Sequence, residues 1–254
     1  MHFSQHPPSP RLQPYIKYYA VLEQEKSKAY KVFPTAGLVM GFQYKGELAA
    51  ISQDTENKLA TAGITGMTDS FRVFKTSGHT CTVLVYFTET GFAHFAAHPV
   101  HELFNLSLGL NELFDKNTVA ELEEKLGAAT IAKQRVNVVD QFLLTQLKDI
   151  EVDKLVVEAV KLIYASRGTI QVKELNKKLL ISQSPFEKRF RKVVGTSAKK
   201  FASIVRFHSV LDNLNGTKSL TEICYENNFF DQAHFIKNFR QFTGDTPENF
   251  KRSI

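Results

Sequence analysis

The sequence predicts an α+β protein of two domains, a strand-rich domain followed by an all-α domain, and three observations lead to this prediction. Short strand patterns separated by turn residues fill residues 13–88. Beyond Leu155 only helical patterns occur. The net charge of +6 is unevenly divided, because residues 155–254 contain 17 Lys and Arg against nine Asp and Glu. A chain of 254 residues is long enough for two such domains.

The first domain is predicted to consist of short antiparallel strands. Apolar and alternating segments occur at residues 15–22, 37–44, 58–65, 70–75 and 81–88, with Gly, Pro, Asn and Asp between them. Many short strands at close spacing are typical of an antiparallel β-barrel or sandwich.

Two helices are predicted to follow the strands. Residues 119–126 form a short acidic amphipathic pattern, which Asn117 or Thr118 would cap. Residues 131–150 form a longer one, and an apolar stripe recurs there at spacings of three or four: Val136, Val139, Leu143, Leu147 and Ile150. Two interpretations of the stripe stay open, packing on its own domain or a dimer seam. We therefore expect domains at residues 1–152 and 153–254.

An internal repeat is the strongest signal in the second domain. QSPFEKRFRKVVG at 183–195 aligns with QAHFIKNFRQFTG at 232–244, with six identities in 13 positions where chance would give about one. The identical pairs are Gln183/Gln232, Phe186/Phe235, Lys188/Lys237, Phe190/Phe239, Arg191/Arg240 and Gly195/Gly244. The chain therefore contains one module twice.

Each copy has the pattern of a helix-turn-helix, at about residues 171–194 and 219–243. In the first copy the turn is expected at Ile181 and Ser182, with Ser182 as the cap of the second helix. In the second copy Asn228 is expected in the turn and Asp231 at the cap. The apolar positions predicted to be buried are Val172, Leu175, Leu179, Phe186, Phe190 and Val193 in the first copy, and Leu220, Ile223, Cys224, Phe235, Phe239 and Phe242 in the second.

The outward faces of the two second helices carry side chains that suit nucleic-acid binding. A Gln side chain can form two hydrogen bonds with adenine, and Lys and Arg side chains can form hydrogen bonds with guanine or with phosphate. The candidate DNA-contacting residues are Gln183, Ser184, Glu187, Lys188 and Arg191 in the first module, and Gln232, Ala233, His234, Lys237 and Arg240 in the second. A helical linker over 197–214 would span about 27 Å, which places the two helices about one DNA turn apart.

Residues 155–254 resemble the DNA-binding domain of the AraC/XylS family of bacterial transcription regulators. The resemblance rests on ISQSPFEKRFRKVVGTSAKKF, on Arg206 in the linker, and on NNFFDQAHFIKNFRQFTGDTPENF. It implies sequence-specific binding to double-stranded promoter DNA and contact with RNA polymerase. The sequence departs from the family pattern at Asn228, where Gly is usual, and at Cys224 and Phe230.

The first domain more weakly resembles the cupin-like sensor domains of such regulators. The shared segments are the early PYI, Pro34 with Gly37, and FTETGFAHFAAHPVHELFNLSLGLNELF. We therefore expect a sequence-specific transcription regulator in which this domain senses a small-molecule effector or forms a homodimer. An effector pocket lined by Tyr15, Tyr18, Tyr19, Phe33, Phe42 and Tyr44 stays open beside a plain core role for these aromatic residues.

Other chemistries receive little support from the sequence. His94, His98 and His101 have a spacing that favours a metal site, but Pro99 interrupts the helix that the site would need. His79 and Cys81 lie two residues apart, which would suit a reactive pair, but the apolar neighbours of Cys81 favour a buried structural thiol. We expect no cofactor, no metal and no enzyme activity, with a cupin-type metal-binding enzyme or sensor tethered to DNA as the alternative.

The location expected from the sequence is the cytoplasm. The N-terminal segment lacks the pattern of a secretory signal, no segment has the run of apolar residues needed to span a membrane, and the only cysteines are Cys81 and Cys224.

Overall fold

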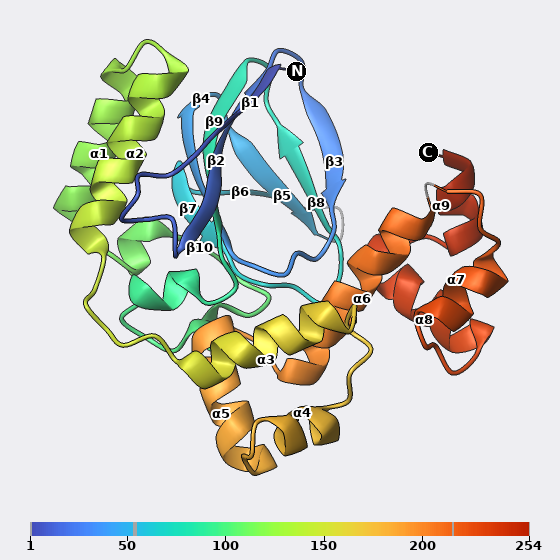
Figure 1. The fold of residues 1–254 in the computed structure, drawn as a ribbon. Helices are drawn as coiled ribbons and strands as arrows, with labels where there is room; N and C mark the ends of the chain where they lie inside the picture. The colour runs from blue at the N-terminus through green and yellow to red at the C-terminus, as the bar shows by residue number, and fades with distance from the viewer. Residues whose placement is uncertain (1, 53–54, 215, 254) are drawn as a thin grey trace.

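A computed structural model describes residues 2–52, 55–214 and 216–253 of the chain. Ten strands and two long helices form the first part of the molecule, and helices α3 to α9 extend below and to one side of it (Figure 1). The predicted order, an antiparallel β domain followed by a helical one, is confirmed.

The strands form two antiparallel sheets. The first has six strands in the order β1-β2-β9-β4-β7-β10, and the second has four in the order β3-β8-β5-β6. The strands are β1 (His2–His6), β2 (Ile16–Gln24), β3 (Lys28–Val32), β4 (Val39–Lys45), β5 (Leu48–Ser52), β6 (Thr55–Lys58), β7 (Ala62–Thr65), β8 (Arg72–Thr76), β9 (Thr80–Phe87) and β10 (Ser107–Gly109).

The predicted strand at 58–65 is wrong as a single element. It contains the end of β6 and all of β7, which belong to different sheets, because the chain crosses between the sheets at Leu59–Thr61. Strands β1, β3, β5 and β10 were not predicted. The first two are mostly exposed, so their sequences lack the clear apolar alternation that marks a half-buried strand.

The main core of the β domain lies between the six-stranded sheet and two helices, α1 (Lys116–Ala128) and α2 (Ala132–Gln146). Val83 and Val85 of β9 are fully buried on this side, and Phe42 of β4 packs edge-on against Phe142 of α2. Three short 3-10 helices connect the sheet to these helices: η1 (Gly91–His94), η2 (Val100–Leu103) and η3 (Leu110–Glu112).

Both predicted helices of this domain exist, with different ends. Asp115 caps α1 by accepting a hydrogen bond from the backbone N–H of Thr118, so the predicted caps Asn117 and Thr118 lie inside the helix. Helix α2 ends at Gln146, four residues before the predicted end, and Ile150 is exposed.

The apolar stripe of α2 packs on its own domain. Val139 and Leu143 are fully buried, and the neighbouring Asp140 accepts hydrogen bonds from the hydroxyl of Tyr19 and the backbone N–H of Ser9. Because this face is already covered, it is not available as the dimer seam that the sequence left open.

Among the residues described, the second part of the molecule consists of seven helices: α3 (Lys154–Ala165), α4 (Val172–Lys178), α5 (Gln183–Val194), α6 (Ala198–Leu214), α7 (Leu220–Glu226), α8 (Gln232–Thr243) and α9 (Pro247–Ser253). Helix α6 connects two groups, with α4 and α5 at one end and α7 and α8 at the other (Figure 1). None of the helices within the described part of the chain is long and apolar enough to cross a membrane.

Candidate nucleic-acid interface

The first module consists of α4 and α5 joined by a tight turn. Leu175 of α4 and Phe186 and Phe190 of α5 are fully buried, as predicted, and Phe190 packs against Phe201 of α6. Spacings of four residues place the two phenylalanines on one face of α5, so the opposite face is left to solvent.

The turn of the first module differs from the prediction. Ser182 stands at the N-cap of α5, but its side chain makes no capping hydrogen bond. The left-handed residue is Leu180, with φ of 50° and 93% of its surface exposed. A leucine in this conformation is uncommon, and no sequence signal marks it.

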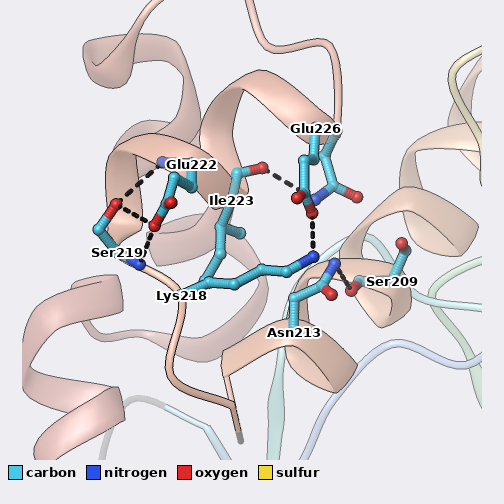
Figure 2. A network of polar contacts seen from close by, with 8 residues as sticks. Ser209, Asn213, Lys218, Ser219, Glu222, Ile223 and Glu226 are labelled. Atoms are coloured by element: carbon cyan, nitrogen blue, oxygen red, sulfur yellow. Dashed lines mark hydrogen bonds and ion pairs between the residues drawn. The ribbon is translucent and has the colours of Figure 1, made fainter.

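The second module consists of α7 and α8. Ser219 and Glu222 form a capping box at the start of α7, and Lys218 forms an ion pair with Glu226 one turn beyond, at 2.5 Å (Figure 2). Ile223 is fully buried below this network. Helix α7 is therefore held at both ends by its own polar groups.

The predicted turn chemistry of the second module is confirmed. Asn228 has φ of 51°, a conformation that asparagine tolerates, and Asp231 accepts a hydrogen bond from the backbone N–H of His234 at 2.6 Å. Phe235, Phe239 and Phe242 are buried. Cys224 is buried as well, and burial raises the pKa of its thiol.

Helices α5 and α8 are equivalent in structure as well as in sequence. Each has 12 residues, and each ends at a glycine in the left-handed conformation, Gly195 with φ of 98° and Gly244 with φ of 75°. We call them the two recognition helices.

The structure brings the predicted residues onto the outer faces of these helices. Glu187 is half-buried and the other nine are exposed: Gln183, Ser184, Lys188, Arg191, Gln232, Ala233, His234, Lys237 and Arg240. Whether they contact DNA stays a prediction. Within the described residues, no carboxylate forms an ion pair with Lys188, Arg191, Lys237 or Arg240, so these four cations face solvent.

One cation of the first recognition helix has a different role. Arg189 donates hydrogen bonds to the carboxylate of Asp153 at 2.9 and 2.7 Å, which ties α5 to the start of α3. Burial alone would raise the pKa of the Asp153 carboxyl, but hydrogen bonds from Arg189 and from the backbone of Val156 outweigh it and lower that pKa.

Gln232 in the second recognition helix and Arg206 in the linker helix both make contacts within the second module. The amide of Gln232 donates to the hydroxyl of Thr221 at 2.9 Å, which holds the Gln232 side chain at the leading end of α8. The guanidinium of Arg206 in α6 lies over the ring of Phe229, 4.4 Å from its centroid, and burial lowers its pKa. Arg206 thus joins the linker helix to the turn of the second module.

The β domain contacts the C-terminal end of both recognition helices at the same repeat position. A methyl group added to Gly195 would lie 3.0 Å from the side chain of Val100, and one added to Gly244 would lie 2.6 Å from the ring of Phe71. Near Gly244, the ammonium of Lys31 donates to the carbonyl of Thr243 at 3.1 Å.

Phe33 and Pro34 also join the domains close to the second module. Phe33 packs edge-on against Phe207 of α6 and Phe250 of α9. The carbonyl of Pro34 accepts a hydrogen bond from His208 at 2.8 Å. The contacts at Gly195 and Gly244 lie at the C-terminal ends of the two recognition helices, so their N-terminal ends are the ends farther from these contacts.

The residues considered for metal or effector binding do not come together. His94 is buried against Tyr15, with its pKa lowered by that burial, whereas His98 is exposed. Across residues 2–52, 55–214 and 216–253, no group of three or more His, Cys, Asp or Glu side chains is placed to hold a metal. His79 lies in an exposed turn at φ of 55°, not in a strand beside Cys81.

The six aromatic residues of the predicted effector pocket are divided among separate environments. Tyr19 and Phe42 are fully buried in the core under α2. Tyr18 stacks on Tyr86, and Tyr44 lies against Arg135. With Tyr15 on His94 and Phe33 at the domain contact, the six do not line one pocket.

Comparison with known proteins gives two family matches. Residues 175–253 match a family described as a helix-turn-helix domain, and residues 4–108 match one described as a domain of unknown function, DUF6597. The Msm operon regulatory protein of Streptococcus mutans is 28% identical over 145 residues, which cover 56% of this chain and 52% of that protein. The match therefore spans about half the length of that relative.

The solved structures that this chain matches are distant from it in sequence. ToxT from Vibrio cholerae is 12% identical, with a TM-score of 0.48 over 93% of this chain and 98% of that one. The C-terminal domain of AraT from Geobacillus stearothermophilus is 17% identical, with a TM-score of 0.39 over 41% of this chain and 89% of that one.

The fold and the two recognition helices define a protein with a double helix-turn-helix domain on one linker helix. Residues 175–253 of this helical part match the helix-turn-helix family, in agreement with the resemblance drawn from the sequence.

Proposed function

We propose that this protein is a sequence-specific regulator of transcription that binds double-stranded promoter DNA through its two recognition helices. One observation carries the proposal: two equivalent helices present Gln, Lys and Arg at the same positions on their exposed faces. The ten candidate residues named above are proposed as the contacts. The N-terminal ends of the two recognition helices would enter the major groove.

The linker helix supports binding to two successive segments of one duplex. Helix α6 has 17 residues, so it is about 26 Å long. Adding the widths of the modules at its ends brings the recognition helices near the 34 Å repeat of about one DNA turn. One chain can then contact two major-groove segments on the same side of the duplex.

Selection of duplexes from a random pool by the full chain tests the proposal. The Ala variants of Gln183, Gln232 and Lys188 are each expected to relax base preference at one position, at a cost of about 1–3 kcal/mol. Arg191→Ala is expected to weaken binding to all duplexes alike and to lower the slope of log affinity against log salt by about one.

Arg189→Ala is the matched control for Arg191→Ala. It removes the same group from the same helix, but this guanidinium is held by Asp153. We expect the salt slope of DNA binding to stay unchanged in this variant. If no duplex were enriched from the pool, or if all four test variants lost affinity uniformly, the proposed readout would be wrong.

We further propose that the chain divides into domains at residues 1–152 and 153–254, and that the first of these, the β domain, modulates DNA binding. Its contacts at Gly195 and Gly244 support this, because a shift of the β domain would change the angle between the recognition helices. A small-molecule effector or a homodimer would be the source of such a shift. We propose that RNA polymerase is a further partner and that the protein acts in the cytoplasm. The proposal includes no catalytic role.

Phe71→Ala tests this modulation because it removes the ring that contacts Gly244. We expect DNA affinity to change by about fivefold or more, the scale of a typical coupling between sites. The sign would show whether the observed domain contact favours or opposes DNA binding. Phe3→Ala, at an exposed site on β1, is the control. An unchanged affinity in Phe71→Ala would contradict the proposed coupling.

A further inference from the structure

The two recognition helices differ at two equivalent positions on their outer faces. Ser184 and Glu187 of α5 correspond to Ala233 and Ile236 of α8 at the repeat spacing. Where the first helix offers a hydroxyl and a carboxylate, the second offers two apolar side chains. The first helix exposes only polar side chains at these positions, so it provides an internal reference.

Ala233 and Ile236 lie in an open hollow on the exposed face of α8. The hollow is lined by Ala233, Ile236, Lys237, Arg240 and Gln241, and 41% of the Ile236 surface is exposed. A branched side chain of this size is left in water at a cost, which a partner that covers it would remove. Lys237 and Arg240 line the same hollow, and neither forms an ion pair with an acidic side chain among the described residues.

A ligand that suits this surface combines negative charge with a small apolar group. The major groove of DNA meets both conditions, because phosphates border it and the C5-methyl group of thymine is the apolar group on its floor. Alanine and other apolar side chains contact this methyl group in known modes of base readout. A protein partner would meet the apolar condition without requiring the two cations.

We infer that Ala233 and Ile236 read thymine methyl groups, so that the second module prefers thymine where the first module reads bases by hydrogen bonds. The inference rests on the proposed function and deepens it. It assigns base preference to Ile236, whose counterpart Glu187 cannot make such a contact.

Replacing thymine with uracil in the selected duplex tests the inference, because uracil lacks only the C5-methyl group. The half-site of the second module is the one whose base preference relaxes in Gln232→Ala. There, each contacted thymine replaced with uracil is expected to weaken binding of the full chain about fourfold. The same replacement in the other half-site is expected to change affinity less than twofold.

Variants of Ile236 connect the effect to this residue. Ile236→Ala is expected to bind the thymine and uracil duplexes nearly alike, whereas Ile236→Val retains most of the difference. Phe230→Ala, which removes an exposed apolar side chain outside the hollow, is expected to keep the full difference. Because Ile236 is exposed, its variants should fold as the natural chain does.

The outcomes separate this inference from the proposed function. A chain that enriches no duplex would overturn both. A chain that binds a selected duplex but has no thymine in the second half-site, or no response to uracil there, would overturn the inference alone. An equal response to uracil in Ile236→Ala would also overturn it and would leave the hollow to a protein partner.

Discussion

Phe239→Ala is expected to unfold the second module and abolish binding of that module to DNA. Phe239 is 2% exposed, and its ring packs on Phe207 of α6 at 5.7 Å and on Phe250 of α9 at 5.4 Å. Removing a buried phenylalanine costs about 3–5 kcal/mol, out of a total of about 5–15 kcal/mol for a domain. Denaturant unfolding of the full chain, followed by DNA binding, measures both effects.

Phe230→Ala is the matched control, since it makes the same chemical change nine residues earlier. Phe230 is 92% exposed, so we expect its removal to change the free energy of unfolding by less than about 0.5 kcal/mol. Phe190→Ala is expected to damage the first module as Phe239→Ala damages the second, because Phe190 is fully buried at the equivalent position. Equal stability of Phe230→Ala and Phe239→Ala would contradict the packing described here.

Inserting five base pairs between the two half-sites of the selected duplex is expected to reduce affinity about 100-fold or more. Five base pairs turn the second half-site to the opposite side of the duplex. Only one module can then bind, and the gain from linking two binding modules, typically 10²–10⁴, is lost. Titration of the full chain against the original and extended duplexes measures the loss.

An insertion of ten base pairs separates rotation from distance. It restores the face of the second half-site but moves it about 34 Å further along the duplex. Helix α6 is continuous from Ala198 to Leu214 and cannot lengthen, so we expect no recovery of affinity. If both insertions left affinity unchanged, the two modules would not bind one duplex together.

The local structure of the helical part was largely predictable from its sequence. The buried phenylalanines, the left-handed Asn228 and the cap at Asp231 all follow from patterns within a few residues of each other. Leu180 is the exception. Its left-handed conformation is required by the tight turn into α5, and no residue preference indicates it.

The β domain was less predictable because its pairings are distant in sequence. Strand β3 pairs with β8, more than 40 residues later. The buried carboxylate of Asp140 accepts a hydrogen bond from the hydroxyl of Tyr19, 121 residues away. Such contacts leave no local period in the sequence, and the exposed strands β1 and β3 have no apolar alternation that would mark them.

By itself, the sequence determined that this protein has two domains, that the second contains a repeated helix-turn-helix, and which of its side chains face outward. Periodicity and residue type are local properties, and they suffice for a helix with one buried face. Only the tertiary structure decided that the stripe of α2 is covered by its own domain, and that Val100 and Phe71 meet the two glycines ending the recognition helices. These contacts join residues about 95 and 173 positions apart, and their formation depends on the shapes of two folded surfaces.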